Sequence, residues 1–199
     1  DSESYARLRS REVVSQRPTS AFEHAREFSF RHALMRDVTY DGVLRSRRRQ
    51  YHALAAQWFR SVIDRSHRPD EYAPTLARHL AEAGEDAEAA RWYLRAGSHA
   101  AGTFSSDNAL MLLDAAERLA PPDEQDLVFD IMLAREPVLD RLGRREEQRA
   151  VIDRMESMSD LDDSRRAQAR LAEGQWLFFH SDYAAAEPVA AEAADLARG

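Results

Sequence analysis

Between Glu27 and Phe59 the hydrophobic pattern of the chain changes its period. Residues Phe28–Phe30 alternate apolar and polar positions, which is typical of a half-buried strand. From His32 onward the apolar residues recur at helical spacing, first at Leu34 and Val38 and then along residues 51–63. The pattern predicts a short strand, a turn, and two successive amphipathic helices.

A second β-like run precedes this segment. Residues 11–15 and 26–30 are short runs with strand character, separated by a polar connection that contains Pro18. We expect the two runs to pair as a hairpin. A hairpin beside neighbouring helices predicts a partial winged-helix-like module over residues 1–68, with its first helix near or before residue 1.

After Pro69 the pattern is helix upon helix, with small residues at regular offsets. One set is Gly84, Ala89, Tyr93 and Ala96; a second is Ala109, Leu113, Ala116 and Pro121; a third is Gly174, Tyr183, Ala186 and Ala193; a degenerate copy is Leu139, Gly143, Ile152 and Met155. These offsets resemble the tetratricopeptide repeat. The sequence therefore predicts a mainly α fold, a tetratricopeptide-like helical-repeat solenoid over residues 69–199.

Several residues should shape these helices. Gly84 and Gly143 suit turns between helices, and Asp162-Asp163 suits a helix N-terminus. Pro137 and Pro188 fall inside predicted helices, where they should kink the helix or mark its first turn. The aromatic residues of this half are expected in the core between helices: Trp92, Tyr93, Trp176, Phe178 and Phe179.

Charge divides the chain near the same boundary. Residues 1–68 hold 14 arginines and 8 acidic residues, whereas residues 69–199 hold 14 arginines and 27 acidic residues. The net charge of −7 is thus the balance of a basic first part and an acidic second part. The sign reversal favours two units, and the acidic unit is unsuited to nucleic acid.

Composition excludes several kinds of chemistry. All 28 basic residues are arginine, so no P-loop or Schiff-base lysine exists in this chain, and without cysteine there is no disulfide or thiolate metal site. The chain contains no Gly-rich phosphate loop and no signal-peptide pattern, and no apolar run approaches the ~20 residues of a membrane span. We expect a cytoplasmic, non-catalytic chain.

The stretch FSFRHALMRDVTY followed by LRSRRRQYHALAAQW, with EYAPTLARHLAEAGEDAEAARWYLRAG after it, carries a family resemblance. It resembles the region that follows the ATPase core in bacterial multidomain signal-transducing ATPases, as fused to class III adenylate or guanylate cyclases or found in LuxR-type regulators. The resemblance covers about residues 7–120. It implies a P-loop ATPase, with ATP or ADP and Mg²⁺, in a parent protein and no cofactor in this chain.

His32 is the sharpest single candidate. It lies where the strand becomes a helix, close to the positive end of that helix. One interpretation is a capping or core-edge histidine. The other follows from the resemblance: RHALMRD is similar to the Met-His-Asp region of apoptotic and plant disease-resistance ATPases, which implies nucleotide sensing by His32. The flanking residues of that motif are replaced here by Arg31 and Ala33.

The arginine cluster Arg45, Arg47, Arg48 and Arg49 has three interpretations. It forms a solvated face or internal ion pairs, it docks on an acidic domain of the parent protein, or it contacts DNA phosphates. A gel shift without salt-sensitive retardation would remove the third. His79 with Glu82, and His99 and His180, offer only a weak metal pattern, and isolated surface or groove histidines explain them better.

The function that these patterns indicate is a regulatory, protein-interaction arm. It would relay binding of a protein or peptide on a concave solenoid surface to an ATPase and output domain. A self-contained scaffold or adaptor is the alternative, and a DNA-binding regulator or a small-molecule sensor are further ones. A Walker A motif encoded upstream would favour the regulatory arm, and a start codon near Asp1 would favour the scaffold. The last residues, Leu196–Gly199, carry no capping pattern, which predicts that the array continues.

Overall fold

The computed structural model describes residues 2–22, 25–159 and 161–198. In this part of the chain, helices account for 73% of the residues, and the remaining regular structure is one two-stranded antiparallel hairpin. The elements are α1 (Ser2–Ser10), β1 (Val14–Gln16), β2 (Phe28–Phe30), α2 (Ala33–Asp41), α3 (Arg45–Ile63), the 3-10 helix η1 (Pro69–Glu71), α4 (Ala73–Ala83), α5 (Asp86–Gly102), α6 (Ser106–Leu119), α7 (Gln125–Arg141), α8 (Arg145–Glu156), α9 (Asp163–Phe179) and α10 (Tyr183–Leu196). The mainly helical class is confirmed.

The predicted hairpin is also confirmed. Val14 pairs with Phe30 and Gln16 with Phe28, in antiparallel register. Its connecting loop reaches the helices through Phe22, whose ring lies 4.9 Å from that of Trp58 and 5.7 Å from that of Tyr72. This aromatic contact fixes the hairpin against the C-terminal half of α3. The winged-helix character of the segment stays a prediction.

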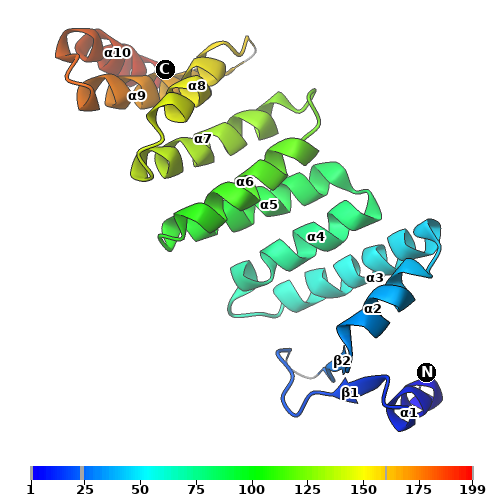
Figure 1. Ribbon diagram of the computed structural model, residues 1–199. Helices are drawn as coiled ribbons and strands as arrows, with labels where there is room; N and C mark the ends of the chain where they lie inside the picture. Colours follow the sequence, from blue (N-terminus) through cyan, green and yellow to red (C-terminus); the bar gives the residue numbers. More distant parts are fainter. Residues whose placement is uncertain (1, 23–24, 160, 199) are drawn as a thin grey trace.

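The helices from α3 to α10 follow one another along the molecule, each packing mainly on its neighbours in sequence (Figure 1). Helix α1 and the hairpin lie at one end, and α9 and α10 lie at the other. Across the predicted boundary at residues 68 and 69, Phe59 and Ile63 of α3 share a buried cluster with Leu76 and Leu80 of α4. The boundary remains a prediction, but the core is continuous through it.

At three helix crossings, the two residues that meet are separated by the same number of positions in the sequence, but their side chains differ. A Cβ added to Gly97 of α5 would lie 2.7 Å from the side chain of Leu113 of α6, so any larger residue would force Leu113 or the helices to shift. Gly174 of α9 packs more loosely on α10, with neighbouring atoms at 3.7 Å or beyond. At the corresponding place in α7 and α8, the Nε2 of Gln148 donates a 2.6 Å hydrogen bond to Glu136.

The turns agree with the sequence. Gly84 and Gly143 have φ values of 86° and 69°, in the left-handed region that favours glycine. Asp162 caps α9 by accepting a hydrogen bond from the amide of Arg165. Pro137 and Pro188 lie inside α7 and α10, both beyond the first turn.

The expectation for the C-terminal aromatic residues was partly wrong. Trp92, Tyr93 and Trp176 are partly buried against core clusters, as expected. Phe178 and Phe179 instead remain 56% and 67% exposed; Phe178 contacts Tyr183 at the start of α10, but this contact does not bury it. No helix among the described residues is both long and apolar enough to cross a membrane.

Candidate functional site

The junction of α2, α3 and α4 holds a chain of polar side chains whose middle member, His52, is buried. Helix α3 turns one face toward α4, and on that face His52 lies among Ala56, Phe59 and Ile63 with only 8% of its surface exposed. The Nδ1 of His52 lies 2.9 Å from the Nδ1 of His79 on α4. Its Nε2 lies 3.0 Å from the hydroxyl of Tyr40, at the end of α2. One hydrogen-bonded chain therefore connects α2 to α4 through α3.

This chain constrains the protons of both imidazoles. A hydrogen bond between the two Nδ1 atoms requires that one carries hydrogen and the other accepts it. Burial lowers the pKa of His52; the charge of Glu82 opposes this shift, and Arg78 and Arg48 add to it. Burial, followed by Arg78 and His52, lowers the pKa of His79 to about 4. Both rings are accordingly neutral at pH 7.

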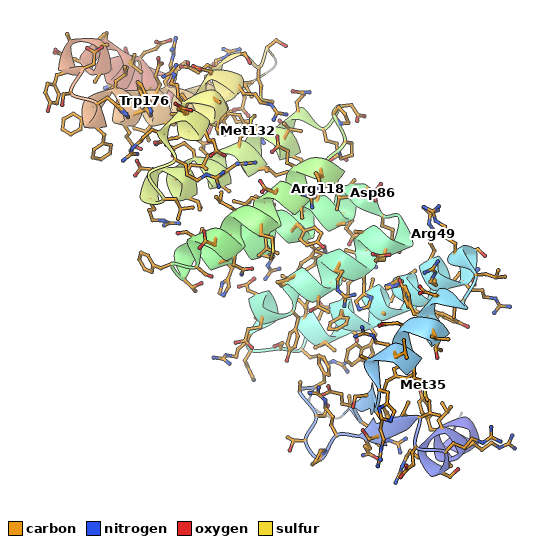
Figure 2. The ribbon with its side chains drawn as sticks, in the orientation of Figure 1. Met35, Arg49, Asp86, Arg118, Met132 and Trp176 are labelled. Atoms are coloured by element: carbon orange, nitrogen blue, oxygen red, sulfur yellow. The ribbon has the colours of Figure 1, made fainter. Side chains whose placement is uncertain are left out.

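Helices α2 and α3, with the turn between them, also carry large apolar side chains that stay exposed. No residue of α2 is buried. We call this surface the α2–α3 face; its large apolar members, with their exposed fractions, are Leu34 (75%), Val38 (66%), Leu44 (73%), Tyr51 (54%) and Leu54 (60%). Figure 2 labels Met35, which lies on α2. Apolar residues clustered in this way are typical of a surface that binds another protein.

His32 lies at the beginning of α2. It is exposed, its backbone is extended with φ −125° and ψ 128°, and its side chain makes no capping hydrogen bond. His32 thus occupies the N-cap position, where its carbonyl accepts the first hydrogen bonds of α2, but its imidazole does not take part in the cap. The core-edge interpretation fits poorly with its exposure. Nucleotide sensing by His32 stays a prediction, and its position leaves the ring accessible to an anion near the helix N-terminus.

The arginine cluster does not act as one patch. Arg48 lies 4.9 Å from the ring centre of Tyr40 and 3.9 Å from Asp41. Arg49, labelled in Figure 2, reaches the turn at Gly84, where its Cζ is 3.4 Å from the position of an added Cβ. Arg45 and Arg47 are exposed and make no ion pair within the described residues. Internal contacts thus account for two of the four, and docking stays a prediction for the others.

The histidines of the weak metal pattern have other partners. His79 is not an isolated groove histidine, as the sequence suggested, but half of the pair with His52. His180 stacks on Trp176 with 3.9 Å between ring centres, and His99 lies 3.7 Å from Asp70. The described part of the chain contains no group of three or more His, Cys, Asp or Glu side chains placed to hold a metal ion.

The repeat positions from the sequence lie mainly at helix contacts. Their buried members are Ala89, Ala96, Ala109, Leu113, Ala116, Leu139, Ile152, Met155, Gly174, Ala186 and Ala193. Pro121 lies in the connection after α6, and Tyr183 is exposed at the first residue of α10. The sequence missed His52, although its place four residues before Ala56 and seven before Phe59 puts it on the buried stripe of α3.

A second titrating pair joins α8 to α9. One guanidinium nitrogen of Arg170 lies 2.9 Å from Glu156 and 2.7 Å from Glu173, so the two carboxyl groups face each other across the junction. Burial, followed by the neighbouring Glu173, raises the pKa of Glu156 to about 7. A hydrogen bond from Glu156 lowers the pKa of Glu173.

Comparisons with known protein families, with curated proteins and with solved structures find no match to this chain. The site is therefore interpreted from its own residues.

Proposed function

We propose that this chain is a non-catalytic interaction arm of a larger signal-transducing ATPase, with the α2–α3 face docking on the nucleotide-binding domain. The observation that carries the proposal is the set of large apolar side chains on α2 and α3 that stay exposed, while none of the residues of α2 is buried. Exposing these apolar side chains to water costs free energy, and burial against another domain would remove that cost.

The helices beyond α3 support a tetratricopeptide-like stack. The crossing of Gly97 with Ala109 and Leu113 recurs as Gly174 with Ala186, and small residues at both let the helices approach closely. Such a stack would offer a surface for a protein or peptide partner, which is the second part of the proposal.

The Tyr40–His52–His79 chain supports a relay between these two parts. A displacement of α2 by a docked domain changes the Tyr40 contact, and through the two imidazoles it reaches α4 without an intervening flexible loop. The coupling should act in both directions: docking at α2 would change partner binding on the helical stack, and partner binding would change docking by the same free energy.

The first test is the reading frame that encodes this chain. A P-loop ATPase encoded before residue 1 is required; a frame without one would reject the proposal and leave the self-contained scaffold. In the full-length protein, Leu34→Ser/Val38→Ser should change nucleotide exchange at least several-fold, because the docking face becomes polar.

The matched control is Met111→Ser, which alters a 61% exposed residue of α6 and should leave exchange unchanged. Equal exchange in the α2–α3 face variant and the wild type would exclude docking through this face. His32→Ala in the same assay tests nucleotide sensing separately, since His32 lies outside that face.

A further inference from the structure

Four turns of the helical stack share one backbone design. The turns after α4, α5, α7 and α9 each close with the same pair of backbone hydrogen bonds, and each holds one residue in the left-handed region: Gly84 (φ 86°), Phe104 (φ 59°), Gly143 (φ 69°) and Ser181 (φ 63°). Glycine adopts this conformation without strain, whereas a Cβ meets a neighbouring carbonyl oxygen there. A bulky aromatic residue such as Phe104 is therefore the least suited of the four to its turn.

Phe104 also stays in contact with water. Its exposed fraction of 82% is larger than that of any other large apolar residue in the described part of the chain. Helices flank this turn on both sides, α3 and α4 on one and α7 to α10 on the other, so the exposure does not belong to an end of the stack (Figure 1). A strained backbone that carries an uncovered ring is typical of a residue that contacts a partner.

Arg141, at the end of α7, gives this surface a positive charge. Its guanidinium carbon lies 5.9 Å from the centre of the Phe104 ring. It makes no ion pair within the described residues, and the carboxylate of the preceding Asp140 is bound by Arg145. Every other arginine between residues 125 and 198 pairs with a carboxylate: Arg135, Arg144, Arg145, Arg149, Arg154, Arg165, Arg166, Arg170 and Arg198. Among the described residues of that range, Arg141 alone is thus left to bind a carboxylate from outside the chain.

The two side chains come from successive helix pairs and meet at one edge of the stack. The α5–α6 and α7–α8 turns lie side by side at that edge (Figure 1). Leu142, which is 37% exposed, follows Arg141 and adds a second apolar side chain. We call Phe104, Arg141 and Leu142 the turn patch. Aromatic residues and arginine are the side chains that most often dominate the binding energy of protein interfaces.

We propose that the turn patch binds an acidic segment of a partner protein. An apolar side chain of that segment packs on Phe104 and Leu142, and a neighbouring carboxylate pairs with Arg141. Glycine at residue 104 would relieve the turn but would remove the ring, which explains why a strained residue occupies this position. The proposal names the surface and the partner chemistry of the helical stack, so it rests on that part of the proposed function and not on docking through the α2–α3 face.

The test measures the fluorescence anisotropy of a labelled peptide that carries one leucine among aspartate and glutamate residues. The wild-type chain should bind it with a Kd on the order of 100 μM, because the surface is small. A peptide with asparagine and glutamine in place of the acids should bind about fivefold more weakly. Phe104→Gly should bind the acidic peptide about tenfold more weakly than the wild type, although its Tm should rise by about 3 °C as the strain of the turn is removed.

Ser181→Gly is the matched control, since it relieves the same backbone conformation at the α9–α10 turn without altering the turn patch. It should also raise the Tm, and it should bind the acidic peptide like the wild type. Arg141→Gln should bind the acidic and the neutral peptide equally, with its Tm unchanged.

The proposal would be overturned by a wild type that does not bind the acidic peptide, or by one that binds both peptides equally. A Phe104→Gly variant that binds as tightly as the wild type, or that gains no Tm, would also overturn it. So would equal binding of a single-stranded DNA oligonucleotide, because the ring would then serve base stacking. None of these results bears on the α2–α3 face, which is tested by nucleotide exchange.

Discussion

Two helix junctions of this molecule, α3–α4 and α8–α9, are each held by a pair of titratable side chains, and they respond to protons in opposite directions. Burial disfavours the charged form of both pairs. For His52 and His79 the charged form is the protonated one, so burial lowers their pKa values. For Glu156 the charged form is the deprotonated one, so burial raises its pKa to about 7.

Burial is therefore one physical cause that makes the two junctions stable in different pH ranges. The His52–His79 junction should contribute most to the free energy of unfolding at neutral pH and less in acid. The Glu156–Glu173 junction should be firmest in mild acid, where one proton lies between the carboxyl groups, and weaken as the pH rises above 7. Between them, the buried residues of α5 and α6 include no ionisable side chain, so the crossing at Gly97 supplies a pH-independent reference.

The largest effect is expected at that reference crossing. Gly97→Val places branched carbon where even a Cβ would lie 2.7 Å from Leu113, and overpacking of this kind should cost about 3 kcal/mol of unfolding free energy. Urea unfolding at pH 5 and pH 8 should give the same loss, because no proton is involved.

Gly174→Ala is the matched control, since the nearest atoms to its new methyl lie at 3.7 Å. It should be neutral or stabilise by about 0.5–1 kcal/mol through helix propensity. A loss for Gly97→Val that depended on pH, or one no larger than that of the control, would contradict the close packing at Gly97.

The next effect concerns the histidine junction. His79→Phe keeps a ring against Phe59, whose centre lies 5.4 Å away, but removes the partner of His52. The folded-state pKa of His79 lies below the ordinary 6.5, so its stabilising effect is present above pH 6.5 and is lost as the pH falls toward 4. Across that pH window the unfolding free energy of the wild type should fall by about 1–2 kcal/mol relative to that of the variant. This value is reduced for the solvent that reaches the ring.

The measurement is urea unfolding of both proteins at pH 7.5 and pH 4.5, so that titrations common to both cancel in the difference. Met111→Ser, on α6 and outside the junction, should track the wild type at both pH values. A wild type that kept its full advantage over His79→Phe at pH 4.5 would show that the imidazole pair does not titrate in this window.

Local structure was largely predictable from the sequence. Alternation at Phe28–Phe30 gave the strand, and Gly84 gave a left-handed turn, because both depend on neighbouring residues alone. Helical spacing also identified the apolar stripe that ends at Phe178 and Phe179. It did not indicate what covers that stripe, so the two rings were wrongly assigned to the core.

Contacts between helices were harder to predict. The sequence contains no local signal for the His52–His79 bond, since its partners lie 27 residues apart and meet only after α3 packs on α4. Gly97 was missed for a similar reason: its importance comes from the approach of Leu113 and not from the residues beside it. The candidate site therefore became visible only with the fold.

The smallest effect tests the acidic junction. Glu156→Gln keeps the shape of the side chain and its hydrogen-bonding capacity but removes the need for a proton. The folded-state pKa of Glu156 lies above the ordinary 4.5, so its stabilising effect is present below pH 4.5 and is lost as the pH rises through about 7. At pH 8 the unfolding free energy of the variant should exceed that of the wild type by about 1 kcal/mol, and at pH 5 the difference should vanish or reverse.

Asp153→Asn is the control, since Asp153 shares Arg149 with Glu156 but lies on the exposed side of α8. If Glu156→Gln instead destabilised the protein equally at both pH values, Glu156 would be an ordinary ion-pair partner of Arg170, and the opposition between the two junctions would not hold.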